Sequence, residues 1–537
     1  MRRIQEFFEN PARLRAMLAS GVGLLAALAF GLLVGSADLE TVVLISAALA
    51  FGFLIVAIRE YWWAPLIFLS FSGFRTTSVG FNLTGFEIGF TVVLISYAIG
   101  MAMRTIEVAS PKISVSWIAS FLFAYLAIHA TLVVVYNRYT DPQGLKNIIR
   151  AYYSAISPLL FCILLSRYCH ARTIRPIVFG LLFFGAFLIA AAIPIHLFEL
   201  DPLHLSMLST GIDWLNPEYA GDALRGCSNY FLFGIAVWPI AKGFARKAAL
   251  SALMGLAVLG TLASSGRIAF AACFVGAMFF ALLRRKWLLL ALTAGAVITV
   301  SAIVTLNPEI LYRFPDSMHR ALITVNFSNA ETSIGEQTGS SDRWHSEIRA
   351  ESIGYWTETW ATFLFGHGYG AWDESLDIRS FGMDFENAKK LAIRMGRTEN
   401  AFSSVTNILG LSGLLLYVAF AGNLAFRLWR ACKATPSQSF ARAMCEFSLV
   451  YLSLFLTFAA FAGGAPGWEV FFWMLGLLAA RPYLGDQPPE TMATETPPLW
   501  SAPLRADVDA NARSSVMPPA DRSAHGVGTR PREGGRR

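Results

Sequence analysis

Two short segments place an arginine among small and polar residues at the start of a long apolar run. They are Arg225-Gly226-Cys227-Ser228-Asn229 and Ser264-Ser265-Gly266-Arg267. A guanidinium stays charged at any ordinary pH, and its fork of N–H groups fits phosphate oxygens. Because a charge at the mouth of a membrane helix is costly and small neighbours leave space, the pattern favours a bound polyanion such as a diphosphate. The alternative is that each arginine extends toward lipid headgroups.

Further arginines follow on the long connection between two later apolar runs. Arg343 stands in Ser341-Asp342-Arg343-Trp344, and Arg394 and Arg397 share one face of a predicted helix. We expect these three to join Arg225 and Arg267 in binding the diphosphate.

A carboxylate and an amide lie where this connection returns to an apolar run. Glu399 could accept a proton from a substrate hydroxyl, since it lies near a basic helical face. The competing interpretation is structural: Asn400 is well suited to cap the following helix, and Glu399 would favour the same helix dipole.

The glycine-rich segment Gly366-His367-Gly368-Tyr369-Gly370 is open to two interpretations. A phosphate loop would follow a strand, and none is predicted here, so a backbone turn that closes the connection onto the membrane is favoured. His367 could act as a base or simply occupy the turn. We expect His367, Tyr369 and Asn400 to lie near the loop end of the site, beside the substrate whose hydroxyl reacts. His345 and Glu347 point apart on a helix, so we expect no metal site.

Long apolar stretches must position all of these residues. Of the 537 residues, 55% are hydrophobic and 15% are charged, and the mean hydropathy is +0.52. Soluble domains carry about 25% charged residues. Here, apolar runs of roughly 18 to 25 residues, long enough to cross a bilayer, recur between residues 14 and 480. The sequence therefore predicts an all-α polytopic membrane protein. The six cysteines form no CxxC pair, and we expect no structural disulfide.

Run length and basic residues predict about fourteen transmembrane helices. Basic clusters fall at every second connection, which the positive-inside rule assigns to the cytoplasm, and an even count places both termini there. The predicted spans are residues 14–34, 41–58, 60–74, 86–103, 115–136, 150–167, 174–197, 226–242, 248–264, 267–284, 286–305, 402–426, 443–462 and 466–480.

Composition divides the chain into a transmembrane domain, residues 1–481, and a tail, residues 482–537. The domain includes a large outer loop, residues 306–401, with predicted helices at 341–365 and 385–397. The tail is rich in Pro, Ala, Ser, Asp and Arg, so we expect it to be disordered and cytoplasmic.

Four of these motifs, in this order, resemble those of the O-antigen ligase and O-antigen (exopolysaccharide) polymerase superfamily of bacterial envelope enzymes. Arg225-Gly226 with Asn229 is similar to an entrance segment, and Ser265-Gly266-Arg267 to a turn between spans. Ser341 to Trp344 and Gly366 to Gly370 resemble the two ends of a large periplasmic loop. Asn400 and Leu409-Gly410-Leu411-Ser412-Gly413-Leu414 resemble the segment that returns that loop to the membrane.

The resemblance implies a metal-independent glycosyltransferase of the inner membrane, with a periplasmic active site and no cofactor. Its donor would be a glycan on undecaprenyl diphosphate, and an acceptor sugar hydroxyl would attack the anomeric carbon. Arg225, Arg267 and Arg343 would then hold the diphosphate and stabilise the charge that develops on it as it leaves. Ligases of this family carry a histidine where this chain has Glu399. This departure favours a polymerase of repeat units over a ligase that transfers polymer to lipid A-core.

Two other classes compete with the enzyme. A flippase or exporter would need charged residues inside several spans, whereas the predicted charges here lie at span ends. A structural membrane scaffold is the other alternative. The expected partners are the lipid-linked glycan, the bilayer and a chain-length regulator or other polysaccharide-assembly protein; no nucleic acid is expected.

Overall fold

The computed structural model describes residues 75–76, 83–84, 117–140, 145–168, 171–200, 220–221, 224–264, 266–307, 333–369, 392–393, 400–459 and 469–484, and the single positions 91, 309, 314, 318, 321 and 398. The regular secondary structure of this part of the chain is helical, except for one short antiparallel pair of strands. In that pair, β1 (Arg75–Thr76) bonds to β2 (Leu83–Thr84), with Arg75 opposite Thr84.

The helices before the long connection are mostly apolar and of similar length. They are α6 (Trp117–Thr140), α7 (Leu145–Tyr168), α8 (Ala171–Leu197), α10 (Cys227–Val237), α11 (Phe244–Ala263), α12 (Arg267–Leu283) and α13 (Trp287–Leu306). A short 3-10 helix, η3 (Trp238–Ile240), follows α10. The later helices are α15 (Ser333–Trp356), α16 (Trp360–Phe365), α18 (Ala401–Ala434), α19 (Phe440–Phe458) and α20 (Glu469–Ala480), followed by η6 (Arg481–Leu484).

Six of the described helices are long and apolar enough to cross a membrane. They are α6, α8, α11, α13, α18 and α19, while α10 with η3, and α12, are shorter apolar helices. The predicted all-helical membrane protein is therefore confirmed at this level. Each predicted span from 115–136 onward coincides with a described helix. The spans 14–34, 41–58, 60–74 and, apart from Thr91, 86–103 lie outside the described residues, as does the tail 482–537 beyond Leu484.

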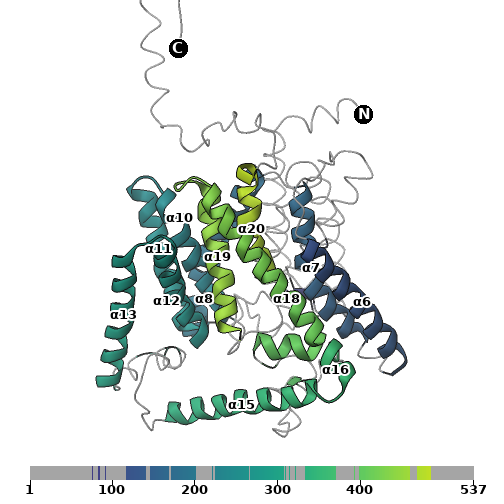
Figure 1. Cartoon of the computed structure of the whole chain (residues 1–537). Helices are drawn as coiled ribbons and strands as arrows, with labels where there is room; N and C mark the ends of the chain where they lie inside the picture. Colours follow the sequence, from purple (N-terminus) through teal and green to yellow (C-terminus); the bar gives the residue numbers. More distant parts are fainter. Residues whose placement is uncertain are drawn as a thin grey trace, which may run out of the picture. The chain divides into compact units, whose positions relative to one another are not determined.

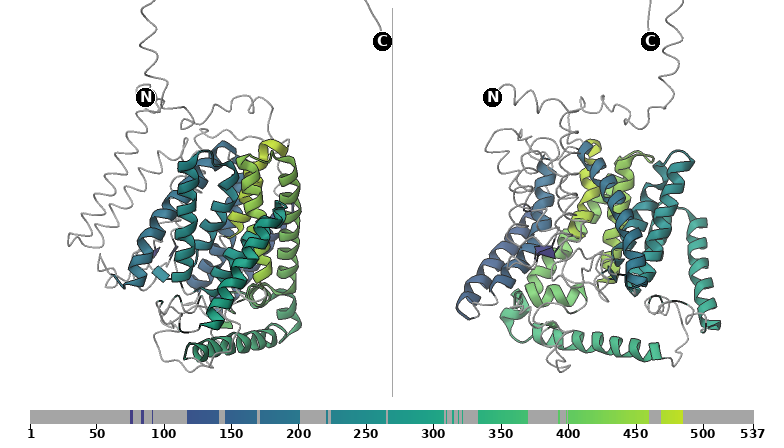
Figure 2. Two further views of the ribbon diagram at one scale, coloured as in Figure 1. Left: turned by 90° about the vertical axis from the view of Figure 1, so that its left-hand side faces the viewer. Right: turned by 180° about the vertical axis from the view of Figure 1, so that it is seen from behind.

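Short turns make α10, α11, α12 and α13 run alternately up and down. Within this group α10 packs against α11 and α12, and α12 packs against α13. The helix α19 packs against α10, α12, α18 and most extensively against α20. Small residues allow that last approach: the Ser448 hydroxyl donates to the Phe472 carbonyl at 2.6 Å and accepts from the Gly476 N–H at 2.8 Å. Figures 1 and 2 show α15 lying across one end of these upright helices.

The helix α18 bends sharply at Gly410. Gly410 has φ +68° and ψ −171°, a conformation that a side chain would strain, so the first piece, 401–409, departs from the axis of the rest. A Cβ at Gly410 would also overlap the Leu364 carbonyl, and one at Gly366 would overlap the Ile408 carbonyl. These two glycines let α16 and α18 meet backbone to backbone. In Figure 1 the first piece of α18 lies beside α16, at the end that α15 crosses.

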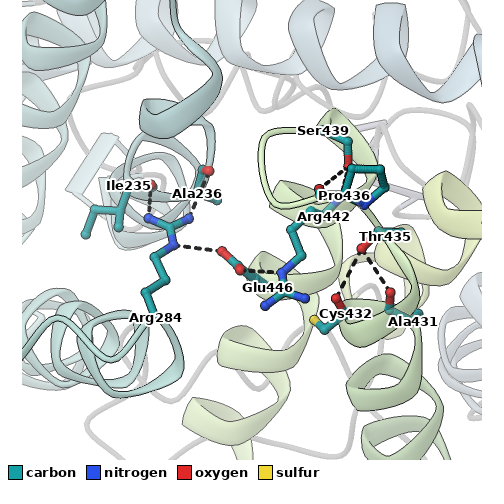
Figure 3. Close-up of polar contacts among 10 residues, drawn as sticks. All are labelled: Ile235, Ala236, Arg284, Ala431, Cys432, Thr435, Pro436, Ser439, Arg442 and Glu446. Atoms are coloured by element: carbon teal, nitrogen blue, oxygen red, sulfur yellow. Dashed lines mark hydrogen bonds and ion pairs between the residues drawn. The ribbon is translucent and has the colours of Figure 1, made fainter.

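A buried ion cluster joins α10, α12 and α19 at the opposite end (Figure 3). Arg284 Nε donates to Glu446 Oε2 at 2.7 Å, and Arg442 Nε donates to Glu446 Oε1 at 2.6 Å. The other two Arg284 nitrogens donate to the carbonyls of Ile235 and Ala236 at 2.9 and 3.0 Å.

This cluster has a local cause at the end of α10. Pro239 has no N–H, so it cannot bond the Ile235 carbonyl one helical turn earlier, and Arg284 supplies the donor instead. Arg284 also lies 5.0 Å from the Phe280 ring centroid. The expectation that charges stay at span ends is thus too simple, because Glu446 lies two turns inside α19 with a side chain only 5% exposed.

Two sequence predictions need correction. The predicted helix 341–365 starts earlier, at Ser333, and is interrupted after Trp356. A capping box at Thr359 and Thr362 then starts the separate helix α16. The span that was expected to begin at Arg150 begins at Leu145. The structure describes only residues 392–393 of the predicted helix 385–397, and these two residues are helical.

Candidate functional site

The two arginine turns lie against one another. Arg225 and Gly226 form the turn before α10, and residues 264–266 join α11 to α12. A Cβ at Gly266 would lie 3.4 Å from Cγ of Arg225, so the Arg225 stem rests on the residue that precedes Arg267. The Ser264 hydroxyl accepts from the Gly266 N–H at 3.2 Å and fixes this turn. Two segments about forty residues apart therefore bring their turns into contact.

This place is at the end of the helices that α15 crosses. Arg267 is the first residue of α12 and Arg284 follows its last, about 26 Å away at 1.5 Å per residue. Since α13 packs antiparallel to α12, its last residue, Leu306, lies at the Arg267 end. Arg225 is exposed and Arg267 is partly buried.

Polar groups extend from Arg225 into the helices, and of these the sequence singled out only Asn229. Asn229, one turn after Arg225, hydrogen-bonds the side chain of Tyr451 on α19. Glu469, the first residue of α20, lies close enough to Tyr417 and Tyr451 for its charge to act on both phenols. The only sequence signal for Glu469 was that a single carboxylate stands at the start of an apolar run.

The ion pair of Arg343 is formed with a residue of its own helix. It is on α15, its side chain is 79% exposed, and its Nε donates to Glu347 Oε1 at 2.7 Å. Glu347 raises the pKa of Arg343, so the guanidinium is charged and partly neutralised by its neighbour. Glu347 lies one helical turn after Arg343, so this ion pair is formed within α15 and not with the Arg225 or Arg267 turn.

The segment Gly366-His367-Gly368 forms the predicted backbone turn. The N–H groups of His367 and Gly368 donate to the carbonyls of Asn407 and Ile408 at 2.7 and 2.9 Å. They satisfy carbonyls that the bend at Gly410 leaves without helical donors, so they do not form a phosphate loop. The His367 ring stacks on Tyr355 at 3.7 Å, and its Nε2 donates to the Tyr355 carbonyl at 2.8 Å.

A histidine on α6 holds the same turn from the other side. His129 Nε2 donates to the Phe365 carbonyl at 2.7 Å, which leaves Nδ1 as the acceptor of the Tyr152 hydroxyl at 2.6 Å. Tyr152 in turn accepts from the backbone N–H of Tyr369. His129 and Tyr152 thus bridge Phe365 and Tyr369, and we name this set the turn clamp. Burial raises the pKa of Tyr369 to about 12, so its phenol stays protonated.

Asn400 caps α18, as the structural interpretation of this residue predicted. Its Oδ1 accepts from the Ser403 N–H at 2.7 Å, and the residue is only 2% exposed. Phe402 N donates to the Ala459 carbonyl at 3.3 Å, which fixes this cap beside the last residue after α19. Because α19 also packs against α10 and α12, the cap lies at the same end as Arg225 and Arg267.

Three predicted site residues, Glu399, Arg394 and Arg397, lie outside the described residues. The four cysteines whose side chains are described, Cys227, Cys273, Cys432 and Cys445, are buried free thiols. Within the described part of the chain, no three His, Cys, Asp or Glu residues gather in a way that could bind a metal ion.

The arrangement offers two arginine turns in contact at one end of the helices, and the capped start of α18 lies at the same end. Comparison with known proteins adds no identification: no protein-family model matches this chain, and no curated protein matches it significantly.

Proposed function

We propose that the protein is a polymerase of lipid-linked oligosaccharide repeat units, working at the periplasmic face of a bacterial inner membrane. The observation that carries the proposal is the contact between the Arg225 turn and the Arg267 turn. Two arginines among small residues suit a diphosphate that bridges them, because each guanidinium can bind two phosphate oxygens.

The reaction we propose is a displacement at the anomeric carbon of the donor sugar. An acceptor hydroxyl oxygen bonds to that carbon, and the bond from the carbon to the undecaprenyl diphosphate oxygen breaks. Arg225 and Arg267 stabilise the charge on the departing diphosphate. Glu399 takes the proton of the hydroxyl, as the general base. Arg343, Arg394 and Arg397 are proposed to approach the donor from the loop 306–401.

The proposal includes the topology that the sequence predicts. About fourteen spans, with both termini in the cytoplasm, place the Arg267 end in the periplasm and the Arg284 end in the cytoplasm. The basic residues at the Arg284 end agree with this orientation. Several of them lie over aromatic rings, as Lys433 does over Trp429 at 4.8 Å and Lys247 over Trp238 at 5.9 Å.

Complementation of a deletion strain of the native bacterium tests the function. Arg267→Ala and Glu399→Gln should abolish long-chain polysaccharide while single repeat units persist on the carrier lipid. Arg430→Ala is the matched control, because Arg430 is an exposed arginine at the other end of the helices, and it should leave chain length normal.

Other outcomes separate the competing classes. Polymer that accumulates on the carrier lipid without reaching lipid A would indicate the ligase. Repeat units that stay on the cytoplasmic side would indicate a flippase. Normal polymer in both variants would contradict the enzyme as assigned here.

A further inference from the structure

The first piece of α18 is unusually polar for a buried helix. Ser403, Ser404, Thr406 and Asn407 are each at most 4% exposed. The helix α15 packs against this piece of α18 and covers part of its polar surface. Asn407 Nδ2 donates to the Ser352 hydroxyl of α15 at 2.6 Å. We call Ser352, Asn400 and Asn407, with the neighbouring hydroxyls, the α15–α18 seam.

Hydrogen bonding in the seam is incomplete. Ser404 and Thr398 bond to each other at 3.0 Å, and Asn400 Oδ1 accepts from Ser403. Two amide atoms then have no partner in the described part of the chain: Asn400 Nδ2 and Asn407 Oδ1. Both residues are 2% exposed. Buried polar atoms without partners are rare and destabilising, so each calls for a physical explanation.

The two atoms define the chemistry of a missing partner. One is a donor and the other an acceptor, and both belong to neutral amides. An ionised phosphate only accepts hydrogen bonds, so it would leave Asn407 Oδ1 unsatisfied. Sugar hydroxyl groups donate and accept at once, and therefore fit both atoms.

We propose that the α15–α18 seam binds a sugar ring of the acceptor glycan, with one hydroxyl donating to Asn407 Oδ1 and another accepting from Asn400 Nδ2. This inference rests on the proposed function for the identity of the glycan. The seam lies at the same end of the helices as Arg225 and Arg267. The proposed acceptor site is therefore lined by neutral groups, whereas the proposed donor site is cationic.

Access to the seam requires α15 to move. Its described packing is against α18 and against Ala392 and Ile393, which contact Ile348. A non-helical break at 357–359 separates α15 from α16, which the turn clamp holds in place. Displacement of α15 about this break would separate Ser352 from Asn407 and open the seam without disturbing the bend of α18.

Binding of a phosphate-free oligosaccharide to the purified full-length protein tests the proposal. The probe is the neutral oligosaccharide released by mild acid hydrolysis from the polysaccharide of the producing strain, and titration calorimetry measures its affinity. The double variant Ser352→Ala/Asn407→Leu removes both bonded partners together, so it should keep the melting temperature. It should bind the oligosaccharide about tenfold more weakly or worse, as expected for lost hydrogen bonds.

Two controls make the result specific. Asn423→Leu makes the same change on the same helix, at another amide whose Oδ1 has no partner, and should leave affinity unchanged. Arg267→Ala should also bind the neutral probe like the wild type, although it loses polymerisation.

The outcomes distinguish this inference from the proposed function. Wild-type affinity in the double variant, or no binding by the wild-type protein, would overturn the seam as a sugar site. Seam-dependent binding in a protein that makes no polymer would support the seam and contradict the polymerase. Polymerisation by a protein whose affinity for the oligosaccharide does not depend on the seam would support the polymerase and contradict the seam as a sugar site.

Discussion

At the scale of single residues, His129 is the side chain through which α6 holds the turn clamp. Its two ring nitrogens bond the Phe365 carbonyl and the Tyr152 hydroxyl, and the residue is 7% exposed. His129→Leu leaves the Phe365 carbonyl without a donor and the Tyr152 O–H without an acceptor, which should lower the free energy of unfolding by about 1–3 kcal/mol for each. Thermal unfolding of the purified protein in detergent measures the change.

The conservative variant His129→Gln separates hydrogen bonding from packing. A glutamine amide presents one donor and one acceptor at a spacing similar to that of the imidazole nitrogens, so it can keep both bonds. We expect its melting temperature to lie close to that of the wild type. Equal losses in the Leu and Gln variants would show that the bonds contribute little.

Residue type alone identified the arginines but not their partners. The arginine segments stood out because a charge beside small residues at an apolar run is locally unusual. His129 and Asn407 did not, because their partners Phe365 and Ser352 are 236 and 55 positions away in the chain. Pairings of this kind depend on the packing of helices, which no local pattern encodes.

At the scale of elements, the bend of α18 depends on glycine. Gly410→Ala adds a side chain at φ +68° that would overlap the Leu364 carbonyl. We expect a loss of roughly 3 kcal/mol or more in unfolding free energy, since strain and overlap add. Chemical denaturation of the purified protein gives this value.

Gly422→Ala is the control for this change. It makes the same substitution in the same helix, and a Cβ there meets nothing within 4 Å. Helix propensity favours alanine over glycine by up to about 1 kcal/mol, so this variant should be as stable as the wild type or more stable. An equally mild effect at Gly410 would contradict the backbone contact between α16 and α18.

The ion cluster around Glu446 joins three helices. Glu446→Ala leaves Arg284 and Arg442 without their shared carboxylate, and loss of one partner of a buried pair costs about 3–5 kcal/mol. Arg430→Ala, which removes an exposed arginine 5.8 Å from the Phe426 ring, should change stability by less than about 1 kcal/mol. Similar melting temperatures for the two variants would show that the cluster does not hold α10, α12 and α19 together.

The helices themselves were predictable, because apolar run length is a property of the sequence alone. From residue 115 onward every predicted span corresponds to a described helix, with limits that differ by at most eight residues. The break after Trp356 was not predicted, because Thr359 and Thr362 form a capping box within an otherwise helical pattern. The bend at Gly410 was missed for a similar reason: glycine permits a bend, but the contact with α16 makes it.

At the scale of the whole molecule, topology is the property to test first. Thr357 and Gln438 are exposed residues at opposite ends of the described helices, and the four described cysteines are buried. In intact cells, a membrane-impermeant maleimide should label Thr357→Cys and leave Gln438→Cys unlabelled. The reverse pattern would place the Arg267 end in the cytoplasm and contradict a periplasmic site.

The central claim is that Arg225 and Arg267 together bind the diphosphate of a lipid-linked glycan. The most direct measurement is chain elongation by the purified protein, supplied with undecaprenyl-diphosphate-linked repeat units, with product length followed by gel electrophoresis. Arg267→Lys keeps the charge and loses the two-pronged geometry, so the rate should fall about a hundredfold, in line with loss of one charge-stabilising donor. Elongation by Arg267→Lys at the wild-type rate would contradict the claim.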